Sequence, residues 1–339
     1  MAWFRPRLLH CLAALAALAA AALGLWPRVA KRRMREALRA AQAQESLWPG
    51  NPLLSNISGS PKPPFITSRR VRELTDGTFR HRSSDVWVVT YPKCGTTWTQ
   101  AIVASLLGRE IDGVTPWHFE QYCPWPERAV GKTTLAALEA MPAPRCLKSH
   151  WSRRDHMALR ERGKVVYVMR NVLDVAVSSF HHYNGFLNLW DNSTTWEDFF
   201  RLFLDGDALN GDYFAHVASW WPHRKDPDVL LLRYEDMKRE PQQQIRRIAD
   251  FLGLQGLSEE QVGKVMEATD FKRMRALEEK LWPRLKRWLG LRKDFRMRTG
   301  VTGEGGAKLT VGERAALQQR YEETLERLGV PWDWVLDSA

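Results

Sequence analysis

Four short runs of mostly apolar residues recur along the chain, separated by longer stretches with helical periodicity. Runs of this kind, rich in Val, Leu and aromatic residues, are typical of strands buried on both faces of a parallel sheet. We expect strands at Val86–Tyr91, Pro144–His150, Lys164–Met169 and Val229–Tyr234. Helical spacing follows in the stretches 96–107, 174–180, 195–221 and 240–251. The alternation predicts one α/β domain with a central parallel sheet flanked by helices.

Charged or polar residues stand at the end of each expected strand. Lys93, His150, Arg170 and Tyr234 all fall just beyond or at the carboxyl ends of these runs. Ligands of open parallel sheets bind in this region, outside the carboxyl ends of the strands. The sequence therefore predicts one active site to which all four strands contribute.

The turn after the first expected strand has the composition of an anion site. Tyr91-Pro92-Lys93-Cys94-Gly95-Thr96-Thr97-Trp98 passes from a strand, through a tight turn with one glycine, into a helix. Backbone N–H groups at such a helix start, together with a lysine, favour a phosphate or sulfate. The order differs from the nucleotide-triphosphatase loop, whose lysine follows its second glycine. We therefore expect a P-loop-like turn of a different class.

The N-terminal segment has a separate character. Leu8–Trp26 spans 19 residues without a charge, which is just long enough to cross a bilayer as a helix. We expect a membrane anchor, and a cleaved signal or transit segment is the alternative. The expected divisions are 1–40 for this segment with its basic flanks, 41–83 for a Pro- and Ser-rich linker leading into the domain, and 84–332 for the catalytic domain.

Positive charge predicts the orientation of this anchor. The formal charge is +11, and residues 1–40 contribute +7 of it, mostly after the apolar run, which leaves +4 for the remainder. This bias places the domain in the cytoplasm. A luminal orientation is the alternative. In the lumen Asn56 and Asn192, each the first residue of an Asn-x-Ser/Thr triplet, could carry sugars. Because the basic excess belongs to the N-terminal segment, it does not indicate a nucleic-acid partner.

Cysteine usage gives no sign of a metal site or a disulfide framework. The four cysteines, Cys11, Cys94, Cys123 and Cys146, lack the spacing of either. We expect a thiol-reduced core, which favours the cytosol. At a helix N-terminus, Cys94 is also a candidate for a lowered pKa and for oxidation.

Five segments in order resemble the cytosolic-type sulfotransferases, from about Ser84 to Leu328. The turn Tyr91–Trp98 resembles the family's phosphosulfate loop, and Lys148-Ser149-His150 its Lys-Thr-His. Three further elements follow it: Arg170-Asn171-x-x-Asp174-x-x-Val177-Ser178, Tyr234-Glu235-Asp236-Met237-Lys238 and Met297-Arg298-Thr299-Gly300-Val301-Thr302-Gly303-Glu304. The resemblance implies transfer of a sulfuryl group from 3′-phosphoadenosine 5′-phosphosulfate to a hydroxyl or amine of a small acceptor, without a metal.

The same resemblance implies roles for individual residues. His150 is the expected base, since a histidine titrates near neutral pH, and Lys93 and Lys148 stabilise charge on the leaving oxygen. The loop residues Lys93, Cys94, Gly95, Thr96 and Thr97 hold the 5′-phosphosulfate. The expected 3′-phosphate ligands are Arg170, Ser178, Arg298, Thr299 and Gly300. The expected adenine contacts are Trp98, Tyr234, Thr269 and Phe271. His181 is the next candidate for the base.

Departures from the family pattern concentrate near the C-terminus. Thr299 replaces a lysine, and Glu304-Gly305-Gly306 stands where the family has Asp-Trp-Lys. The family's dimer segment is likewise altered, so the oligomeric state stays open. Two alternatives therefore remain: a Golgi-type carbohydrate sulfotransferase, or a catalytically impaired nucleotide-binding protein. The acceptor is not predicted, because its pocket would come from the irregular stretches 115–130 and 185–195 and from the segment after Phe271. The aromatic-rich part of the first stretch, Thr115 to Arg128, either lines this pocket or packs over the core.

Overall fold

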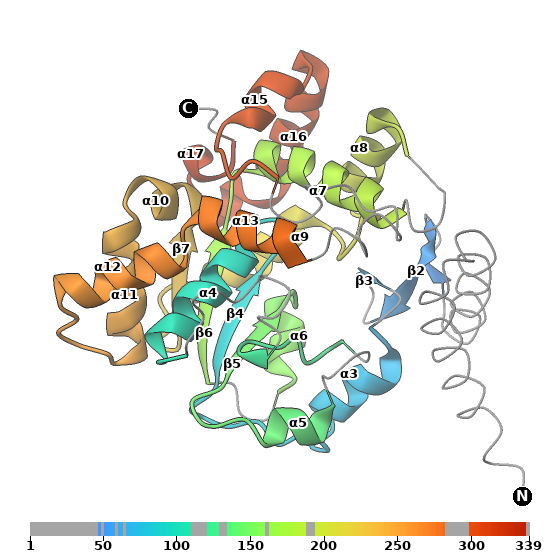
Figure 1. The fold of residues 1–339 in the computed structure, drawn as a ribbon. Helices are drawn as coiled ribbons and strands as arrows, with labels where there is room; N and C mark the ends of the chain where they lie inside the picture. Colours follow the sequence, from blue (N-terminus) through green and yellow to red (C-terminus); the bar gives the residue numbers. More distant parts are fainter. Residues whose placement is uncertain are drawn as a thin grey trace, which may run out of the picture.

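A computed structural model describes residues 47–336, apart from 49–50, 58–59, 64–65, 110–120, 129–133, 160–162, 188–193 and 282–297. Its central sheet consists of β4 (Val86–Thr90), β5 (Cys146–Ser149), β6 (Lys164–Met169) and β7 (Val229–Arg233). The strand order is β5-β4-β6-β7, and every neighbouring pair is parallel. The predicted parallel sheet is confirmed, with each expected run forming one strand (Figure 1).

Each face of the sheet is covered by its own set of helices. Val86 and Val88 pack with Ile102 of α4 (Thr96–Leu106) and with α11 (Pro241–Leu252) and α12 (Glu259–Ala268). Trp87 and Val89 point the other way, into a cluster with α7 (Val172–Leu187), α8 (Trp196–Asp205), α9 (Tyr213–Trp220) and α16 (Val311–Thr324). Side chains of a strand alternate between faces, so two apolar faces require a continuously apolar strand.

The remaining elements are short or lie at the edges. The other helices are α3 (Ser68–Thr75), α5 (Leu135–Glu139), α6 (Arg153–Met157), α10 (Tyr234–Arg239), α13 (Phe271–Leu281), α15 (Glu304–Lys308) and α17 (Trp332–Val335), with 3₁₀ turns η3 (Trp221–His223) and η4 (Glu326–Leu328). The expected helical stretch 195–221 is divided into α8 and α9. Gly206 ends α8 in the left-handed conformation, with φ of 80°. The break follows from this glycine, which commonly terminates a helix.

Part of the expected linker 41–83 is structured. A small antiparallel sheet consists of β1 (Leu47–Trp48), β2 (Asn51–Ile57) and β3 (Ser60–Lys62). Helix α3 begins at a cap in which the Thr67 hydroxyl accepts from the Arg70 N–H. Leu74 and Phe79 are buried in the main core cluster. The packed part of the domain therefore extends to the N-terminal side of Ser84.

A buried ion pair aligns the edge strand that carries the expected base. Arg145 Nε donates to Asp85 Oδ1 at 2.7 Å and Nη2 to Oδ2 at 2.6 Å, and neither side chain is exposed. Asp85 directly precedes β4, and Arg145 directly precedes β5. Removing one partner of such a pair leaves an uncompensated charge. The pair thus holds the starts of β4 and β5 in register.

The apolar run Leu8–Trp26 lies outside the described residues. Within the part of the chain that the structure describes, no helix has both the length and the apolar character needed to cross a bilayer.

Candidate active site

The turn between β4 and α4 has the backbone shape of an anion-binding nest. Lys93 and Gly95 both adopt left-handed conformations, with φ of 70° and 89°, and α4 begins at Thr96. Successive N–H groups in such a turn point into one concavity at the helix start. The Thr96 hydroxyl is hydrogen-bonded to the Thr90 hydroxyl at 2.6 Å. This contact links the helix start to the end of β4.

Gly95 is required by a close approach as well as by its φ. A Cβ at this position would lie 2.6 Å from the Tyr234 ring. Tyr234 begins α10 directly after β7, so the turn after β4 packs against the end of β7. The single glycine of the turn therefore lets two of the expected site elements meet.

His150 lies at the end of β5 in a defined tautomer. Its Nδ1 is 2.8 Å from the Thr90 carbonyl oxygen. A carbonyl accepts only, so Nδ1 carries the proton and the Nε2 lone pair is the basic site. Burial, and then the charge of Lys148, hold the pKa of His150 well below its usual range. The ring is neutral at pH 7 and can accept a proton on Nε2.

Trp125 contacts both expected catalytic residues of β5, and sequence reasoning did not include it among the site residues. Its ring meets the His150 ring edge-on, with centroids 5.0 Å apart, and the Lys148 Nζ lies 4.1 Å from its centroid. The Pro124 carbonyl also accepts from the Lys148 backbone N–H at 2.8 Å. This part of the irregular stretch 115–130 therefore packs against Lys148 and His150. Residues 110–120 lie outside the described part.

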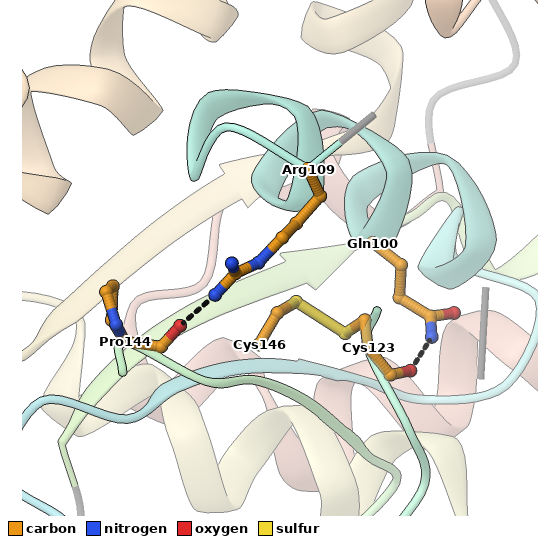
Figure 2. The surroundings of a disulfide bond; sticks show 5 residues. All are labelled: Gln100, Arg109, Cys123, Pro144 and Cys146. Carbon is orange, nitrogen blue, oxygen red and sulfur yellow. Dashed lines mark hydrogen bonds between the residues drawn. A yellow bond between two sulfur atoms is a disulfide. The ribbon is translucent and has the colours of Figure 1, made fainter. Parts of the chain in front are cut away.

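A disulfide ties this loop to β5, which the sequence did not predict. Cys123 and Cys146 are bonded, with their Cα atoms 4.6 Å apart, and Cys123 accepts through its carbonyl from Gln100 Nε2 at 2.8 Å (Figure 2). Both cysteines are buried. The expectation of a wholly thiol-reduced core was wrong, because pairing depends on the distance between strand and loop in space and not on sequence spacing.

The expectation for Cys94 was also wrong. Its side chain has no exposed surface, and burial raises the pKa of the thiol well above its ordinary value despite the nearby charges of Arg170 and Lys93. Desolvation disfavours the thiolate, and it outweighs the helix start. Cys94 is therefore a protonated packing residue.

Glu127 is a titratable group beside the site that the sequence did not single out. It accepts from the Ser149 hydroxyl, which in turn accepts from the Trp151 N–H at 3.0 Å. Burial raises the pKa of Glu127 to about 7. With 1% of its surface exposed, it is enclosed by protein, so it positions the end of β5 without reaching a substrate.

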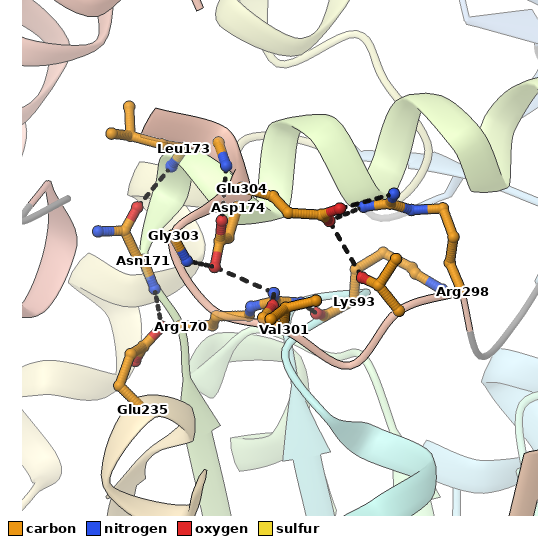
Figure 3. Close-up of polar contacts among 12 residues, drawn as sticks. Lys93, Arg170, Asn171, Leu173, Asp174, Glu235, Arg298, Val301, Gly303 and Glu304 are labelled. Atoms are coloured by element: carbon orange, nitrogen blue, oxygen red, sulfur yellow. Dashed lines mark hydrogen bonds and ion pairs between the residues drawn. The ribbon is translucent and has the colours of Figure 1, made fainter. Parts of the chain in front are cut away.

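Arg170 connects three parts of the site. Its Nη1 donates to the Lys93 carbonyl at 3.2 Å, and its Nη2 donates to Asp174 at 3.1 Å and to the Val301 carbonyl at 3.0 Å (Figure 3). The guanidinium also lies 4.4 Å from the centroid of the Tyr234 ring. The loop after β4, helix α7 and the C-terminal segment therefore converge on one arginine.

The segment Arg298–Lys308, here termed the strap, is held to α7 by a carboxylate. Asp174 accepts from the backbone N–H groups of Gly303 at 3.0 Å and Gly305 at 2.8 Å (Figure 3). A Cβ on Gly305 would lie 2.2 Å from the Leu173 carbonyl carbon. The glycines of this altered element thus permit direct contact between the strap backbone and α7.

The residues expected around adenine form a second group. The Trp98 and Tyr234 rings meet edge-on at 5.9 Å, and Lys238 Nζ lies 5.7 Å from the Trp98 centroid and 5.8 Å from that of Phe271. A Cβ on Gly300 would lie 2.7 Å from the Phe271 ring. Thr269 is buried, and its hydroxyl donates to the Val265 carbonyl at 2.8 Å. Tyr234 joins this group to Arg170 and the loop.

Two expected residues stand apart from these contacts. Ser178 is half-buried on α7, one turn beyond Asp174. His181 is half-buried on the same helix, where its Nε2 is 3.1 Å from Lys308 Nζ of the strap. Asp174 and Glu304, which hold the strap, were part of quoted motifs but were not assigned a role from the sequence. Their roles depend on the spatial neighbourhood of α7 and the strap.

The arrangement suits an anionic nucleotide and offers no metal site among the residues that the structure describes. Arg170 Nε and Arg298 Nε are buried N–H groups without a hydrogen-bond partner in that part of the chain. Orphan donors of this kind are rare in proteins and indicate an absent acceptor. Two arginines at one end and a nest with Lys93 at the other match a ligand with two separate anionic groups.

Comparison with known proteins agrees with this geometry. Residues 83–329 match a family model described as the sulfotransferase domain. The chain is 29% identical to the amine sulfotransferase of Oryctolagus cuniculus, over 84% of this chain and 94% of that protein. It is 30% identical to sulfotransferase 1A1 of Canis lupus familiaris, over 82% of this chain and 95% of the relative.

Solved structures show the same fold. Mouse sulfotransferase SULT7A1 complexed with PAP superposes with a TM-score of 0.62 at 25% identity, covering 80% of this chain and 93% of that one. Retinol dehydratase in complex with androsterone and inactive cofactor PAP gives a TM-score of 0.60 at 24% identity, covering 76% and 85% of the two chains.

Proposed function

The chain belongs to the sulfotransferase family, and on this premise we propose how its residues transfer a sulfuryl group from 3′-phosphoadenosine 5′-phosphosulfate to the hydroxyl or amine of a small acceptor. The nest of Lys93, Gly95 and Thr96, with Cys94 and Thr97, binds the 5′-phosphosulfate. Arg170, Ser178 and the strap residues Arg298, Thr299 and Gly300 bind the 3′-phosphate. Trp98, Tyr234, Thr269 and Phe271 surround the adenine.

His150 acts as the base in this proposal. Its Nε2 takes the proton of the acceptor while the Nδ1–H stays on the Thr90 carbonyl, which fixes the ring. A bond forms between the acceptor oxygen or nitrogen and sulfur, and the bond between sulfur and the bridging oxygen of the 5′-phosphate breaks. Lys93 and Lys148 stabilise the charge that grows on the bridging oxygen. Adenosine 3′,5′-bisphosphate leaves.

The single observation that carries the proposal is the position of His150. It is a neutral, oriented imidazole on the strand next to the anion-binding turn, bonded to the last residue of β4. The test is transfer of radiolabelled sulfate from the donor to a panel of phenols, alcohols and amines. We expect labelled ester or sulfamate with the wild type. Binding of adenosine 3′,5′-bisphosphate without transfer to any acceptor would favour the catalytically impaired alternative instead.

We also propose that Leu8–Trp26 anchors the chain in a membrane, on the basis of its length and lack of charge. Extraction of membranes with alkaline carbonate tests this. The full chain should stay in the pellet, whereas a Leu15→Arg/Leu18→Arg variant should be released. Release of both proteins would contradict the anchor.

The orientation of this anchor has a separate test. The basic cluster after Trp26 supports a cytoplasmic domain, as does its kinship with cytosolic-type enzymes. The Cys123–Cys146 disulfide is a type of bond common in oxidising compartments and supports the lumen. We propose the cytoplasmic orientation, and protease treatment of intact microsomes should then degrade the domain. A protected domain with sugar on Asn56 or Asn192 would contradict it.

A further inference from the structure

The arginine that we assign to the 3′-phosphate is already paired with a carboxylate of its own chain. Arg298 Nη1 donates to Glu304 Oε1 at 3.1 Å, and Nη2 donates to Oε2 of the same carboxylate. The Thr299 hydroxyl donates to Oε2 at 3.0 Å. Figure 3 shows Glu304 reaching along the strap to Arg298. The contact has the two-pronged geometry with which arginine also binds phosphate.

Glu304 is ionised in this contact. Partial burial tends to raise its pKa, but the hydrogen bonds from Arg298 and Thr299 outweigh burial and leave the pKa below the ordinary value. The pair therefore carries no net charge at neutral pH. About a fifth of the Arg298 side chain and a third of that of Glu304 are exposed, so solvent weakens the pair without abolishing it.

Arg170, which we also assign to the 3′-phosphate, is compensated in the same way. Arg170 is paired with Asp174, whose carboxylate also accepts the two amide N–H groups of the strap. Two arginines thus face two carboxylates, and the sum of their formal charges is zero. A phosphate at this end gains less Coulomb energy than one facing unpaired arginines. Because Glu304 occupies the edge of the Arg298 guanidinium formed by Nη1 and Nη2, a phosphate must displace it to bind that edge with two hydrogen bonds.

We propose that Glu304 is a donor-specificity residue, which competes with the 3′-phosphate for Arg298 and thereby lowers the preference for 3′-phosphorylated over unphosphorylated adenosine nucleotides. The inference rests on the proposed function, because it takes from there the assignment of Arg298 to the 3′-phosphate. The 5′-group and the adenine bind elsewhere, so Glu304 affects only the contribution of the 3′-phosphate.

The test compares two nucleotides that differ only in that phosphate. Calorimetry with adenosine 3′,5′-bisphosphate and adenosine 5′-monophosphate measures both affinities for the wild type and for Glu304→Gln. We expect the variant to bind the bisphosphate about 5- to 20-fold more tightly, since one partly exposed charge-assisted pair no longer opposes it. The affinity for the monophosphate should change by less than about twofold. The matched control is Glu322→Gln on α16, whose carboxylate accepts from Gln318.

Two further variants keep the inference testable if Glu304→Gln is poorly folded. Glu304→Ala removes the carboxylate without putting an amide in its place, and it should likewise tighten bisphosphate binding by about 5- to 20-fold. In an Arg298→Met background, Glu304→Gln should have no effect on either nucleotide. A bisphosphate-to-monophosphate ratio that is unchanged in Glu304→Gln and Glu304→Ala would overturn the inference, while sulfate transfer by the same preparation would leave the proposed function intact. A wild type that binds neither nucleotide would overturn both.

Discussion

Replacing His150 by Asn separates the structural role of its Nδ1 from the basic role of its Nε2. The Asn amide N–H₂ can take the place of Nδ1–H and donate to the Thr90 carbonyl, which accepts from His150 at 2.8 Å. The basic Nε2 is lost without leaving this buried carbonyl unpaired. If His150 is the base, His150→Asn should therefore lose turnover while the end of β5 keeps its position.

The size of the loss follows from the role of the group. A positioned general base contributes about 10²- to 10⁴-fold, which corresponds to about 2.7–5.5 kcal/mol of activation free energy. We expect turnover to fall at least 100-fold, and affinity for adenosine 3′,5′-bisphosphate to change less than about threefold. Burial and Lys148 lower the pKa of His150, so the acid limb of the wild-type pH–rate profile should lie well below pH 6.5. Above that pKa the imidazole is neutral and active.

The assay compares acceptors of graded acidity. A nitrophenol that is largely ionised at neutral pH needs no base, so His150→Asn should affect its sulfation least, and that of an aliphatic alcohol most. His223→Asn is the matched control, because His223 is partly exposed and bonded to Asp226 away from the sheet end. An equal loss for all acceptors, or a loss confined to donor binding, would refute the role of His150 as base. His181 would then be tested next.

Three further changes probe the donor site and its support. Lys93→Ala should weaken binding of adenosine 3′,5′-bisphosphate by about 10- to 100-fold by calorimetry and abolish transfer, since it removes the charge of the turn; unchanged binding would exclude Lys93. Asp174→Asn should speed proteolysis within the strap, because the amides of Gly303 and Gly305 lose an ionised acceptor; an equally resistant strap would contradict this. Reduction of the Cys123–Cys146 disulfide should lower the free energy of unfolding by about 2–4 kcal/mol in urea, and a Cys146→Ser variant should be insensitive to the reductant.

The sheet could be predicted because its strands are buried on both faces. Val86 and Val88 pack into one core cluster, and Trp87 and Val89 pack into the other. The run is therefore apolar throughout, and such a run can be recognised in the sequence alone. The edge of the domain was less predictable. The stretch 41–83 has too many prolines and serines for a periodic pattern, yet Leu74 and Phe79 pack into the core. A few apolar residues are enough to hold that stretch against the core, and they do not form a periodic pattern in the sequence.

The site residues also fall into those that could be located from the sequence and those that could not. Lys93, His150 and Arg170 could be located because strand ends of a parallel sheet meet at one edge. Trp125 could not, since it reaches that edge from an irregular loop whose path is set by tertiary contacts. Cys123 of the same loop is bonded to Cys146 at the start of β5, a pairing that depends equally on the path of the loop. Cys94 shows the limit of local reasoning in energetic terms. Its place near a helix start favours the thiolate and would lower the pKa. Complete burial disfavours the thiolate more strongly, so the pKa of the thiol is raised.

Arg170 gives the site its internal coupling. Its guanidinium holds the Lys93 carbonyl at the reacting end and the Val301 carbonyl of the strap at the other. Asp174 binds both Arg170 and the strap amides, so any shift of the strap on donor binding changes the contacts of the residue that supports the turn. Displacement of Glu304 by a 3′-phosphate would be such a shift. Glu304→Gln should therefore alter turnover only by changing the fraction of enzyme that has bound the donor. At a saturating donor concentration, the rate of the variant should equal that of the wild type.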